Sequence, residues 1–249
     1  MSAPGSRVAL VTGASGGIGS ATVARLVAQG YAVVGVDLEP APTTWTEHDG
    51  VMHVRGDVRH RSALQGAVDI ALERWGRLDA TVAAAAIIAG GRPLWETPDE
   101  DLQQLWDVDV RGVWNTAAVA VPAMLAGPAP GGCRFVAVAS AAATYGLFHL
   151  SAYSAAKHAV VGLVKGLAVD LVATGVTAVA VSPGSTRTPM LERTADLYGF
   201  SDPEVFASNQ LLRRILEPDE VAATIAFCCS AEGAVLNGSV VYADGGFRP

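Results

Sequence analysis

The chain has 249 residues, of which 51% are hydrophobic and 16% are charged. This length and composition predict one globular domain over residues 1–249 with a large core, and they argue against a disordered chain. The formal net charge of −7 argues against nucleic acid and against an anionic membrane as partners, because both select clustered Lys and Arg side chains.

The sequence carries no recognisable targeting or metal-binding pattern. The N-terminal segment has no charged region followed by an apolar one, and the most apolar long stretch, residues 159–181, is interrupted by Lys165 and Asp170. Cys133 and the adjacent Cys228–Cys229 have neither metal nor redox spacing, and the five histidines are not paired as ligands. We therefore expect a reduced, cytoplasmic location, no membrane association and no metal.

Apolar runs of strand length alternate along the chain with stretches of helical period. The predicted strands are Arg7–Val11, Ala32–Val36, Val51–Arg55, Ala80–Ala84, Arg134–Ala139, Thr177–Val181 and Gly238–Tyr242. The predicted helices are Gly17–Gln29, Arg61–Trp75, Asp99–Leu125, Ala152–Thr174 and Pro218–Ser230. This alternation implies right-handed crossovers and a parallel sheet covered on both faces. We predict a doubly wound (Rossmann) α/β fold, a three-layer sandwich around a seven-stranded parallel sheet.

The first predicted strand runs into a glycine-rich turn and then a helix. Gly13, Gly17 and Gly19 have the spacing G-x-x-x-G-x-G, which differs from the more familiar G-x-G-x-x-G. Glycines let a pyrophosphate approach the backbone, and the helix N-terminus offers it free N–H groups and a positive dipole end. Glycine also serves plain turns, so the strand–turn–helix context carries this prediction of a dinucleotide site.

A carboxylate near the turn indicates which dinucleotide is bound. Asp37 closes the second strand, where a carboxylate can bind both hydroxyls of the adenosine ribose. A 2′-phosphate there would meet negative charge without a nearby Lys or Arg, so we predict NAD over NADP. Asp57, after the third strand, is positioned to reach the adenine edge; both aspartates also suit ordinary loops.

Tyr153 and Lys157 are four residues apart on a predicted helix, so they share one face. A phenol has an ordinary pKa near 10, and a neighbouring ammonium together with an oxidised nicotinamide would pull that pKa toward neutrality. Ser140 follows the fifth strand, where its hydroxyl can orient a substrate oxygen and support developing negative charge. By itself, a Tyr-x-x-x-Lys pair is more often an ordinary amphipathic pair.

Taken together and in this order, these motifs resemble the short-chain dehydrogenase/reductase family, in its single-domain branch, over essentially the whole chain. The motifs are Thr12-Gly13-x-x-x-Gly17-x-Gly19, Ser140, Tyr153-x-x-x-Lys157, Ser182-Pro183-Gly184 and Asp244-Gly245-Gly246. The resemblance implies that Lys157 also binds the nicotinamide ribose, that Thr188 holds the nicotinamide end, and that the protein is a homotetramer. The cofactor contacts that it implies are Gly13, Ser15, Gly17, Ile18, Gly19, Asp37, Asp57, Val58, Ala84, Tyr153, Lys157, Pro183, Gly184, Thr186 and Thr188.

Two positions depart from the family pattern. Residues 83–86 are four alanines where the family usually has Asn-Asn-Ala-Gly, and we expect altered bracing of the sheet more than lost activity. Asp109 replaces the usual Asn, which is thought to hold a water in a proton relay to the lysine. We expect Asp109 to keep a relay role as a fourth catalytic residue and, if ionised, to weaken the effect of Lys157 on Tyr153 and raise the pH optimum.

In the family, the segment near residues 188–210 forms a mobile flap over the substrate. Its side chains here are largely apolar or aromatic, as in Pro189–Leu191, Leu197–Phe200 and Phe206, which favours a moderately hydrophobic alcohol or ketone, although the same side chains could merely pack the flap down. His149 and Trp95 are candidate pocket residues, and either could equally be an ordinary core or surface group.

The resulting prediction is an NAD(H)-dependent oxidoreductase that interconverts a secondary alcohol and a ketone. An epimerase or dehydratase of the extended family is disfavoured by the glycine spacing and the lack of a substrate domain. A non-catalytic NAD-binding regulator would explain the two departures, but it would not need Ser140, Tyr153 and Lys157 together. A dehydrogenase that holds NAD tightly and passes electrons to another redox carrier is the third alternative.

Overall fold

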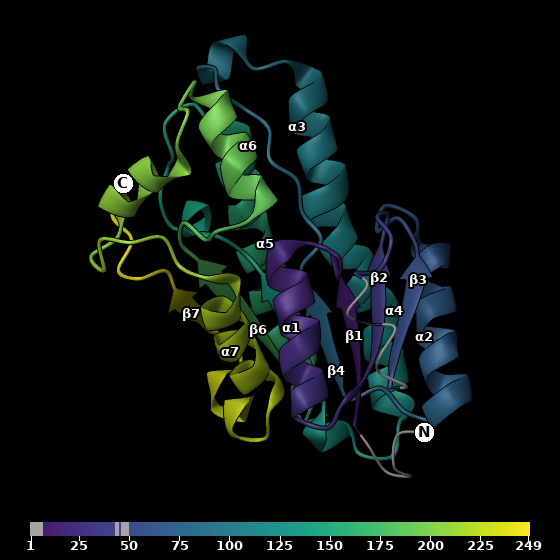
Figure 1. The fold of residues 1–249 in the computed structure, drawn as a ribbon. Helices are drawn as coiled ribbons and strands as arrows, with labels where there is room; N and C mark the ends of the chain where they lie inside the picture. The colour runs from purple at the N-terminus through teal and green to yellow at the C-terminus, as the bar shows by residue number, and fades with distance from the viewer. Residues whose placement is uncertain (1–6, 43–44, 46–49) are drawn as a thin grey trace.

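The computed structural model describes residues 7–42, 45 and 50–249 of the chain. At its centre is a seven-stranded sheet in the order β3-β2-β1-β4-β5-β6-β7, in which every pairing is parallel (Figure 1). The strands are β1 Val8–Thr12, β2 Ala32–Asp37, β3 Val51–Arg55, β4 Ala80–Ala83, β5 Arg134–Val138, β6 Thr177–Pro183 and β7 Val240–Ala243. The predicted seven-stranded parallel sheet is confirmed.

Helices cover both faces of the sheet (Figure 1). Their bounds are α1 Gly17–Ala28, α2 Arg61–Trp75, α3 Asp99–Leu105, α4 Arg111–Ala126, α5 Ser151–Asp170, α6 Pro189–Leu197 and α7 Pro218–Cys229. α1 and α7 pack against one face and against each other, while α2, α4 and α5 pack against the other. The doubly wound α/β class is thereby confirmed, and no described helix is long and apolar enough to cross a membrane.

The strand sequences show why this sheet is covered on both faces. All five residues of β1 are buried, and they alternate between the two layers: Val8 and Leu10 join the core under α2, α4 and α5, while Ala9 and Val11 join the core under α1 and α7. A strand buried on both faces has no polar side to present, so its sequence is a continuous apolar run instead of an alternating one. This run is the signal from which the strand was predicted.

The predicted helix 99–125 is interrupted in the structure. Between α3 and α4 the segment Trp106–Val110 forms a π-helical turn, η3, which carries Asp109. π-Turns are rare and occur mostly as single turns inside α-helices, often at functional sites. The turn leaves the apolar period nearly intact on both sides, which explains why the sequence predicted one continuous helix.

One helix end and one whole helix also differ from the sequence prediction, while the other bounds of the predicted elements shift by at most two residues. α5 ends at Asp170 instead of Thr174, because the chain turns through Ala173, with φ of 63°, and Gly175, with φ of 83°. α6 was not predicted at all, although Thr188 accepts a hydrogen bond from the Leu191 N–H as the helix cap and Pro189 occupies the first helical position. Both are standard features of a helix start.

Candidate active site

A cleft of about 1130 Å³ opens at the carboxyl ends of the strands. The chain order reverses there, because β2 lies on one side of β1 and β4 on the other, and such switch points are the usual ligand sites of doubly wound sheets. All of the predicted cofactor contacts line this cleft, as does the predicted catalytic Ser140. Asp109 lies behind the lining, and the candidate pocket residues His149 and Trp95 do not line the cleft.

The glycine turn leaves no room for side chains at two positions. Gly13 has φ of 66°, and a Cβ added to it would lie 2.6 Å from the backbone nitrogen of Ala85. A Cβ on Gly19 would lie 2.0 Å from the carbonyl oxygen of Gly13, far inside van der Waals contact. α1 begins at Gly17 without a side-chain cap, so its first N–H groups are available to a ligand. This backbone cradle fits the pyrophosphate of a dinucleotide.

Asp37 lies at the end of β2, next to the glycine turn. Its carboxylate accepts hydrogen bonds from the N–H of Ser15, at 2.9 Å, and from the N–H of Glu39, at 3.0 Å. The aspartate therefore braces the turn, and its charge faces the end of the cleft that would hold the adenosine ribose. The arrangement fits a ribose with free hydroxyls.

The surroundings of Asp37 correct one detail of the sequence argument. Arg59 also lines the cleft, so a basic residue is present at this end. Its guanidinium is bound to Asp57 through contacts of 2.6 to 3.1 Å, and this pairing holds the pKa of the Asp57 carboxyl below its ordinary value. Because the Arg59 charge is matched by Asp57, the local field at Asp37 stays negative.

Three side chains converge at the other end of the cleft. Ser140 lies two residues after the end of β5, and its Oγ accepts a hydrogen bond from the N–H of Ala142 at 3.1 Å. Tyr153 lies in the first turn of α5 and Lys157 one turn later, and both are buried. The Nζ atom of Lys157 is 5.6 Å from the centre of the Tyr153 ring. The i, i+4 spacing and the strand end thus place the residues as the sequence predicted.

Asp109 contacts Lys157 directly. Its Oδ2 atom lies 3.1 Å from the Lys157 Nζ, and the side chains are 0% and 2% exposed. The Oδ1 atom accepts a hydrogen bond from the N–H of Ile87 at 2.9 Å, and Lys157 also donates to the carbonyl of Val138 at 3.4 Å. An ammonium has three donors, so one remains for a ligand in the cleft.

The pKa of Tyr153 in the chain alone reflects burial and three neighbouring side chains, without the nicotinamide that the sequence expectation included. Burial raises the pKa of the phenol above its ordinary value; the Lys157 cation lowers it, Asp109 raises it further, and a hydrogen bond with Ser140 lowers it. In the chain itself, desolvation outweighs the ammonium, so the pKa of Tyr153 lies above 10 and not toward neutrality. The expected weakening of the Lys157 effect by Asp109 has the predicted direction.

Asp109 and Lys157 each shift the pKa of the other toward its charged form. Burial lowers the pKa of Lys157, but Asp109 and then Tyr153 raise it by more, so the lysine stays protonated. Burial raises the pKa of the Asp109 carboxyl above its ordinary value, and Lys157 and the Ile87 N–H offset only part of this rise. The 3.1 Å contact with the ammonium favours the ionised form of Asp109, and an ionised pair adds little net charge to the site.

The alanine segment after β4 is braced by backbone groups. The N–H groups of Ala84 and Ala85 lie 3.2 and 3.4 Å from the hydroxyl of Thr12, at the end of β1. Together with the bond from Ile87 to Asp109, these contacts tie the segment to two neighbouring elements. The side chains of Thr12 and Asp109 therefore accept the hydrogen bonds that hold this segment in place.

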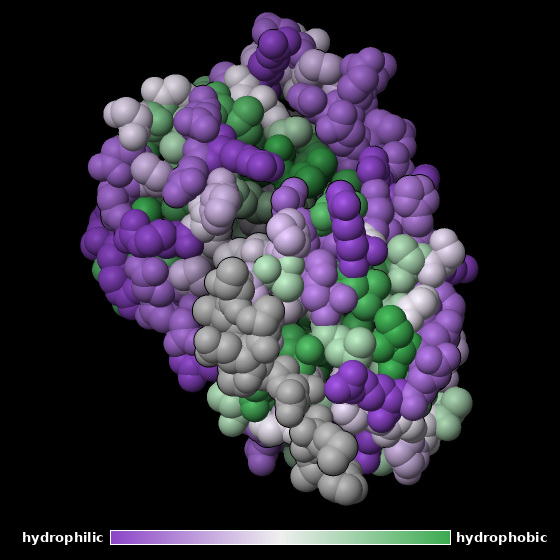
Figure 2. Space-filling model, turned by 45° about the vertical axis from the view of Figure 1, so that its right-hand side comes forward, coloured by the Kyte–Doolittle hydropathy of each residue, from purple (hydrophilic) through white to green (hydrophobic). Residues whose placement is uncertain are grey.

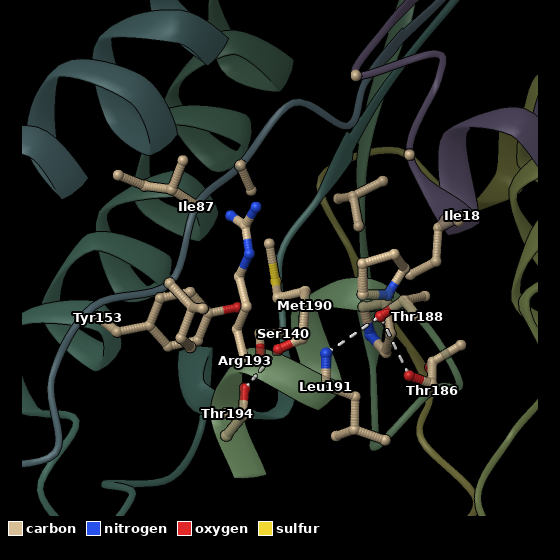
Figure 3. A pocket seen from close by; sticks show the side chains of 18 of the residues that line it. Ile18, Ile87, Ser140, Tyr153, Thr186, Thr188, Met190, Leu191, Arg193 and Thr194 are labelled. Atoms are coloured by element: carbon tan, nitrogen blue, oxygen red, sulfur yellow. Dashed lines mark hydrogen bonds between the residues drawn. The ribbon is translucent and has the colours of Figure 1, made fainter. Parts of the chain in front are cut away.

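The segment after β6 covers the cleft near Ser140 and Tyr153. Met190, Leu191 and Thr194 of α6 line it, and Tyr198, Phe200 and Phe206 pack together with ring centres 5.8 to 6.0 Å apart. Figure 3 shows the α6 side chains beside those of Tyr153 and Ser140. On the face in Figure 2, hydrophobic side chains gather in a hollow near the top, surrounded by hydrophilic ones.

Arg193 is a site residue that the sequence analysis missed. It points from α6 into the cleft, with its guanidinium toward Ile87 (Figure 3). The only available signal was a lone basic residue within the otherwise apolar and acidic segment 189–200.

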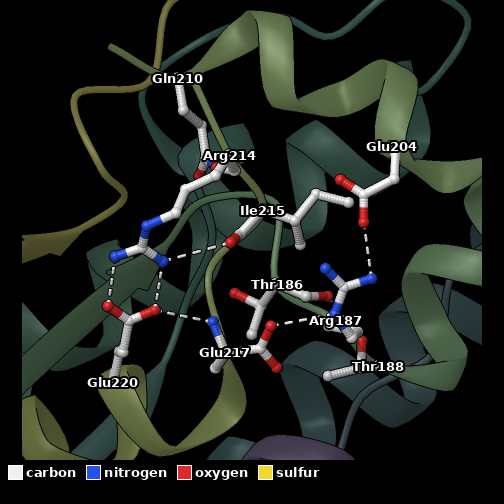
Figure 4. A network of polar contacts seen from close by, with 9 residues as sticks. All are labelled: Thr186, Arg187, Thr188, Glu204, Gln210, Arg214, Ile215, Glu217 and Glu220. Carbon is white, nitrogen blue, oxygen red and sulfur yellow. Dashed lines mark hydrogen bonds and ion pairs between the residues drawn. The ribbon is translucent and has the colours of Figure 1, made fainter. Parts of the chain in front are cut away.

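A polar network fixes both ends of this covering segment (Figure 4). Arg187 contacts Glu204 at 2.7 Å and Glu217 at 3.0 Å, which links the 3₁₀ segment η6, Pro203–Asn209, to the start of α7. Arg214 contacts Glu220 at 2.6 Å, and Glu220 also accepts from the N–H of Glu217.

Among the described residues, no group of three or more His, Cys, Asp and Glu side chains could hold a metal ion.

Comparison with known proteins places this site in a family. Residues 13–248 match the family model described as Enoyl-(Acyl carrier protein) reductase. The chain is 33% identical to a 2-(R)-hydroxypropyl-CoM dehydrogenase of Xanthobacter autotrophicus over 97% of its own length and 98% of that protein. It is 32% identical to a 3beta-hydroxysteroid dehydrogenase of Mediterraneibacter gnavus, over 97% of this chain and 94% of that protein.

A solved structure shares the whole fold. The 3-ketoacyl-(acyl-carrier-protein) reductase from Brucella melitensis, complexed with NADH, superposes with a TM-score of 0.87 at 30% identity, over 96% of this chain and 97% of that one. The chain belongs to the short-chain dehydrogenase/reductase family. It is an oxidoreductase that interconverts a secondary alcohol and a ketone with a nicotinamide cofactor.

Proposed function

We propose that the protein uses NAD(H) in preference to NADP(H) and that Tyr153 is the proton donor and acceptor of the reaction. The observation that carries this proposal is the convergence of Ser140, Tyr153 and Lys157 at one end of a cleft whose other end holds the glycine turn and Asp37. A chain that only bound a dinucleotide would need the second set of residues but not the first.

The described residues fit NAD in three places. The backbone turn at Gly13 and Gly19 suits a pyrophosphate, and a side chain at either position would collide with neighbouring backbone and distort the turn. The Asp37 carboxylate suits ribose hydroxyls, whereas a 2′-phosphate would meet like charge. Lys157 has one donor left for the second ribose. When bound, the nicotinamide supplies the hydride acceptor or donor of the reaction.

The chain's own residues then handle the substrate oxygen and its proton. Ser140 orients the oxygen by hydrogen bonding and stabilises negative charge that develops on it. Tyr153 accepts the hydroxyl proton during oxidation and returns it during reduction. Lys157 lowers the pKa of the phenol. Asp109 positions Lys157 and raises the pKa of the phenol, which offsets part of the effect of Lys157. We assign Asp109 a positioning role because it contacts Lys157 and does not line the cleft.

The lining supports an apolar carbon skeleton in the substrate. Ile87, Leu147 and Met190 surround the catalytic end of the cleft, and such surfaces favour alkyl groups. The relatives named above are dehydrogenases of a hydroxypropyl compound and of a hydroxysteroid, so their substrates carry the reacting hydroxyl on different skeletons. The segment near residues 188–210 is proposed as the substrate flap of a single domain.

The test is NADH absorbance during incubation with a panel of secondary alcohols and, in reverse, of ketones. We expect turnover with NAD, weaker turnover with NADP, and a loss of about a hundredfold to ten-thousandfold in kcat on Tyr153→Phe, which is the contribution typical of a general acid–base group. Turnover that survives Tyr153→Phe would contradict the mechanism.

The same purified protein distinguishes two alternative functions from the proposed one. Retention of NAD through purification, with slow exchange and turnover only with an added electron acceptor, would support a tightly held cofactor coupled to another redox carrier. Binding of NAD without turnover of any alcohol or ketone would support a regulator.

A cytoplasmic homotetramer is the state that we propose for the protein. Cys133, Cys228 and Cys229 are free and buried, which fits a reducing compartment. Trp114 on α4 and Val169 on α5 are 56% and 72% exposed, and exposed apolar residues on two long helices suit subunit contacts. Light scattering coupled to size exclusion would measure the mass, and a monomer would contradict the proposal.

A further inference from the structure

Arg193 differs from the other cations of the cleft in having no acidic partner. Of the three cationic side chains that line the cleft, Arg59 is paired with Asp57 and Lys157 with Asp109. Among the described residues, no carboxylate lies within ion-pair distance of the Arg193 guanidinium. Among the described residues that line the cleft, Arg193 is therefore the one cation without a carboxylate partner, and its charge is available to a ligand.

Arg193 lies at the end of the cleft that holds Ser140 and Tyr153. Figure 3 shows its side chain leaving α6 beside Tyr153 and Met190, with the guanidinium directed into the pocket toward Ile87. The acidic side chains of the lining are Asp37, Glu39 and Asp57, which follow β2 and β3 at the opposite end. Among the described residues, no Asp or Glu side chain lines the cleft around Ser140 and Tyr153, so Arg193 brings an unmatched positive charge to this end.

The pyrophosphate of the cofactor is a poor match for this charge. Its cradle is the turn at Gly13 to Gly19, and Ile18 of that turn lies on the far side of Met190 from Arg193 in Figure 3. Arg193 is exposed in the chain itself, and the lining beside it is apolar, as at Ile87 and Met190. A ligand that fills this space removes water from the guanidinium, which then needs an acceptor, and an oxyanion is the strongest one.

We propose that Arg193 binds an oxyanion carried by the substrate, so that the substrate is an apolar secondary alcohol or ketone with a carboxylate or another oxyanion at a second position. This inference rests on the proposed function, since it identifies the class of substrate at the same site. A carboxylate and a sulfonate each present two or more oxygen atoms that can accept hydrogen bonds from one guanidinium, so both belong to this class.

The experiment compares pairs of substrates in which a carboxylate is replaced by its uncharged methyl ester. The pairs are 3-hydroxybutanoate, 4-hydroxypentanoate and 5-hydroxyhexanoate, each beside its methyl ester, and a hydroxyalkanesulfonate of similar length tests the second oxyanion. We expect kcat/KM to favour the best acid over its ester by roughly tenfold to a hundredfold, mainly through KM, as a charge-assisted hydrogen bond in a partly apolar site would give. Arg193→Met should bring this ratio close to one, and Arg193→Lys should retain part of it.

Arg61 offers a matched control. It is an exposed arginine at the start of α2 and does not line the cleft, so Arg61→Met should keep the full acid-to-ester ratio. A ratio that falls equally in Arg61→Met and Arg193→Met would assign the preference to the general charge of the protein, and it would overturn the proposal. A weaker affinity for NAD in Arg193→Met, without a change in the acid-to-ester ratio, would overturn it too.

A binding measurement separates this inference from the proposed function. Calorimetric titration of the NAD-loaded protein with 4-oxopentanoate and with its methyl ester reports anion binding without turnover. Selective binding of the acid that disappears in Arg193→Met, in a protein that oxidises none of the alcohols, would support the anion site while the proposed function fails. Turnover that depends on Tyr153 but shows no preference for any acid or sulfonate would leave the proposed function standing and overturn the anion site.

Discussion

The carboxylate of Asp109 lies 3.1 Å from the ammonium of Lys157, and both side chains are almost completely buried. Apart from this ammonium, the Oδ2 atom of Asp109 has no partner among the described residues. Burying two charges costs several kcal/mol per ion, which their attraction offsets only when the geometry is good. At position 109 an uncharged amide could also hold the lysine by hydrogen bonding. The carboxylate of Asp109 instead acts electrostatically on Tyr153 as well as on Lys157.

Replacing Asp109 by Asn should move the pH dependence of alcohol oxidation to lower pH. The Asp109 carboxylate raises the pKa of Tyr153, so its removal lowers that pKa, and the phenolate needed to accept a proton forms at lower pH. We expect the rising limb of kcat/KM to shift down by roughly one pH unit. The measurement is a pH–rate profile of both proteins with one alcohol; an unchanged profile would remove Asp109 from the mechanism.

The same pair should show strong coupling in stability. Asp109→Ala leaves a buried ammonium without its counter-charge, and Lys157→Met leaves a buried carboxylate, so each should lower the free energy of unfolding by about 3 kcal/mol. The double variant removes both charges and should lose clearly less than the sum of the two single losses. Denaturant titrations of the four proteins give the coupling; additive losses would mean that the two charges do not stabilise each other.

Asp37 should control the choice between the two nicotinamide cofactors. Asp37→Asn has one oxygen left and can accept a hydrogen bond from only one of the N–H groups of Ser15 and Glu39, and it removes the charge that a 2′-phosphate would meet. Relieving a like-charge contact of this kind should raise the ratio of kcat/KM for NADP over NAD roughly tenfold to a hundredfold.

The control for Asp37 is the nearby carboxylate of Asp57. Asp57→Asn removes the same charge as Asp37→Asn, but it also frees the Arg59 guanidinium, which could then attract a 2′-phosphate, so some gain in NADP use is expected from this variant as well. A larger gain in NADP use from Asp57→Asn than from Asp37→Asn would show that Arg59, and not Asp37, decides cofactor choice.

The fold and the main site residues could be predicted because they depend on local patterns. The buried strands are continuous apolar runs, and the glycine turn and the Tyr153–Lys157 spacing are fixed by backbone geometry alone. The ion pair of Asp109 with Lys157 depends on the π-turn at 106–110, which rotates one residue out of the helical period and leaves no mark in the apolar pattern.

The direction of Arg193 and the pKa of Tyr153 were beyond the sequence for a different reason. Both depend on what surrounds a side chain in three dimensions: the absence of a carboxylate near Arg193 among the described residues, and the degree of burial of Tyr153. α6 is an intermediate case, because its cap Thr188 and its Pro189 are visible in the sequence but were assigned to a flap.

Glu220 should make the stability of the protein sensitive to acid at the start of α7. Hydrogen bonds from Arg214, and then from the N–H of Glu217, lower the pKa of Glu220 from 4.5 to about 2. A carboxyl whose pKa is lower in the folded protein contributes stability above its unfolded pKa and loses it as the pH falls toward the folded value. The contribution of Glu220 should therefore be complete above about pH 5 and vanish between pH 4.5 and about 2.

The test compares Glu220→Gln with the unaltered protein across this range. Because Glu220 and Arg214 are largely exposed, solvent screens the pair, and we expect a loss below about 1 kcal/mol at neutral pH that shrinks to nothing near pH 2. Glu100→Gln is the matched control, since Glu100 also lies in the first turn of a helix but has no guanidinium partner among the described residues. If the two variants lose the same stability at every pH, the capping contact of Glu220 with Arg214 and Glu217 contributes nothing beyond a general charge at a helix N-terminus.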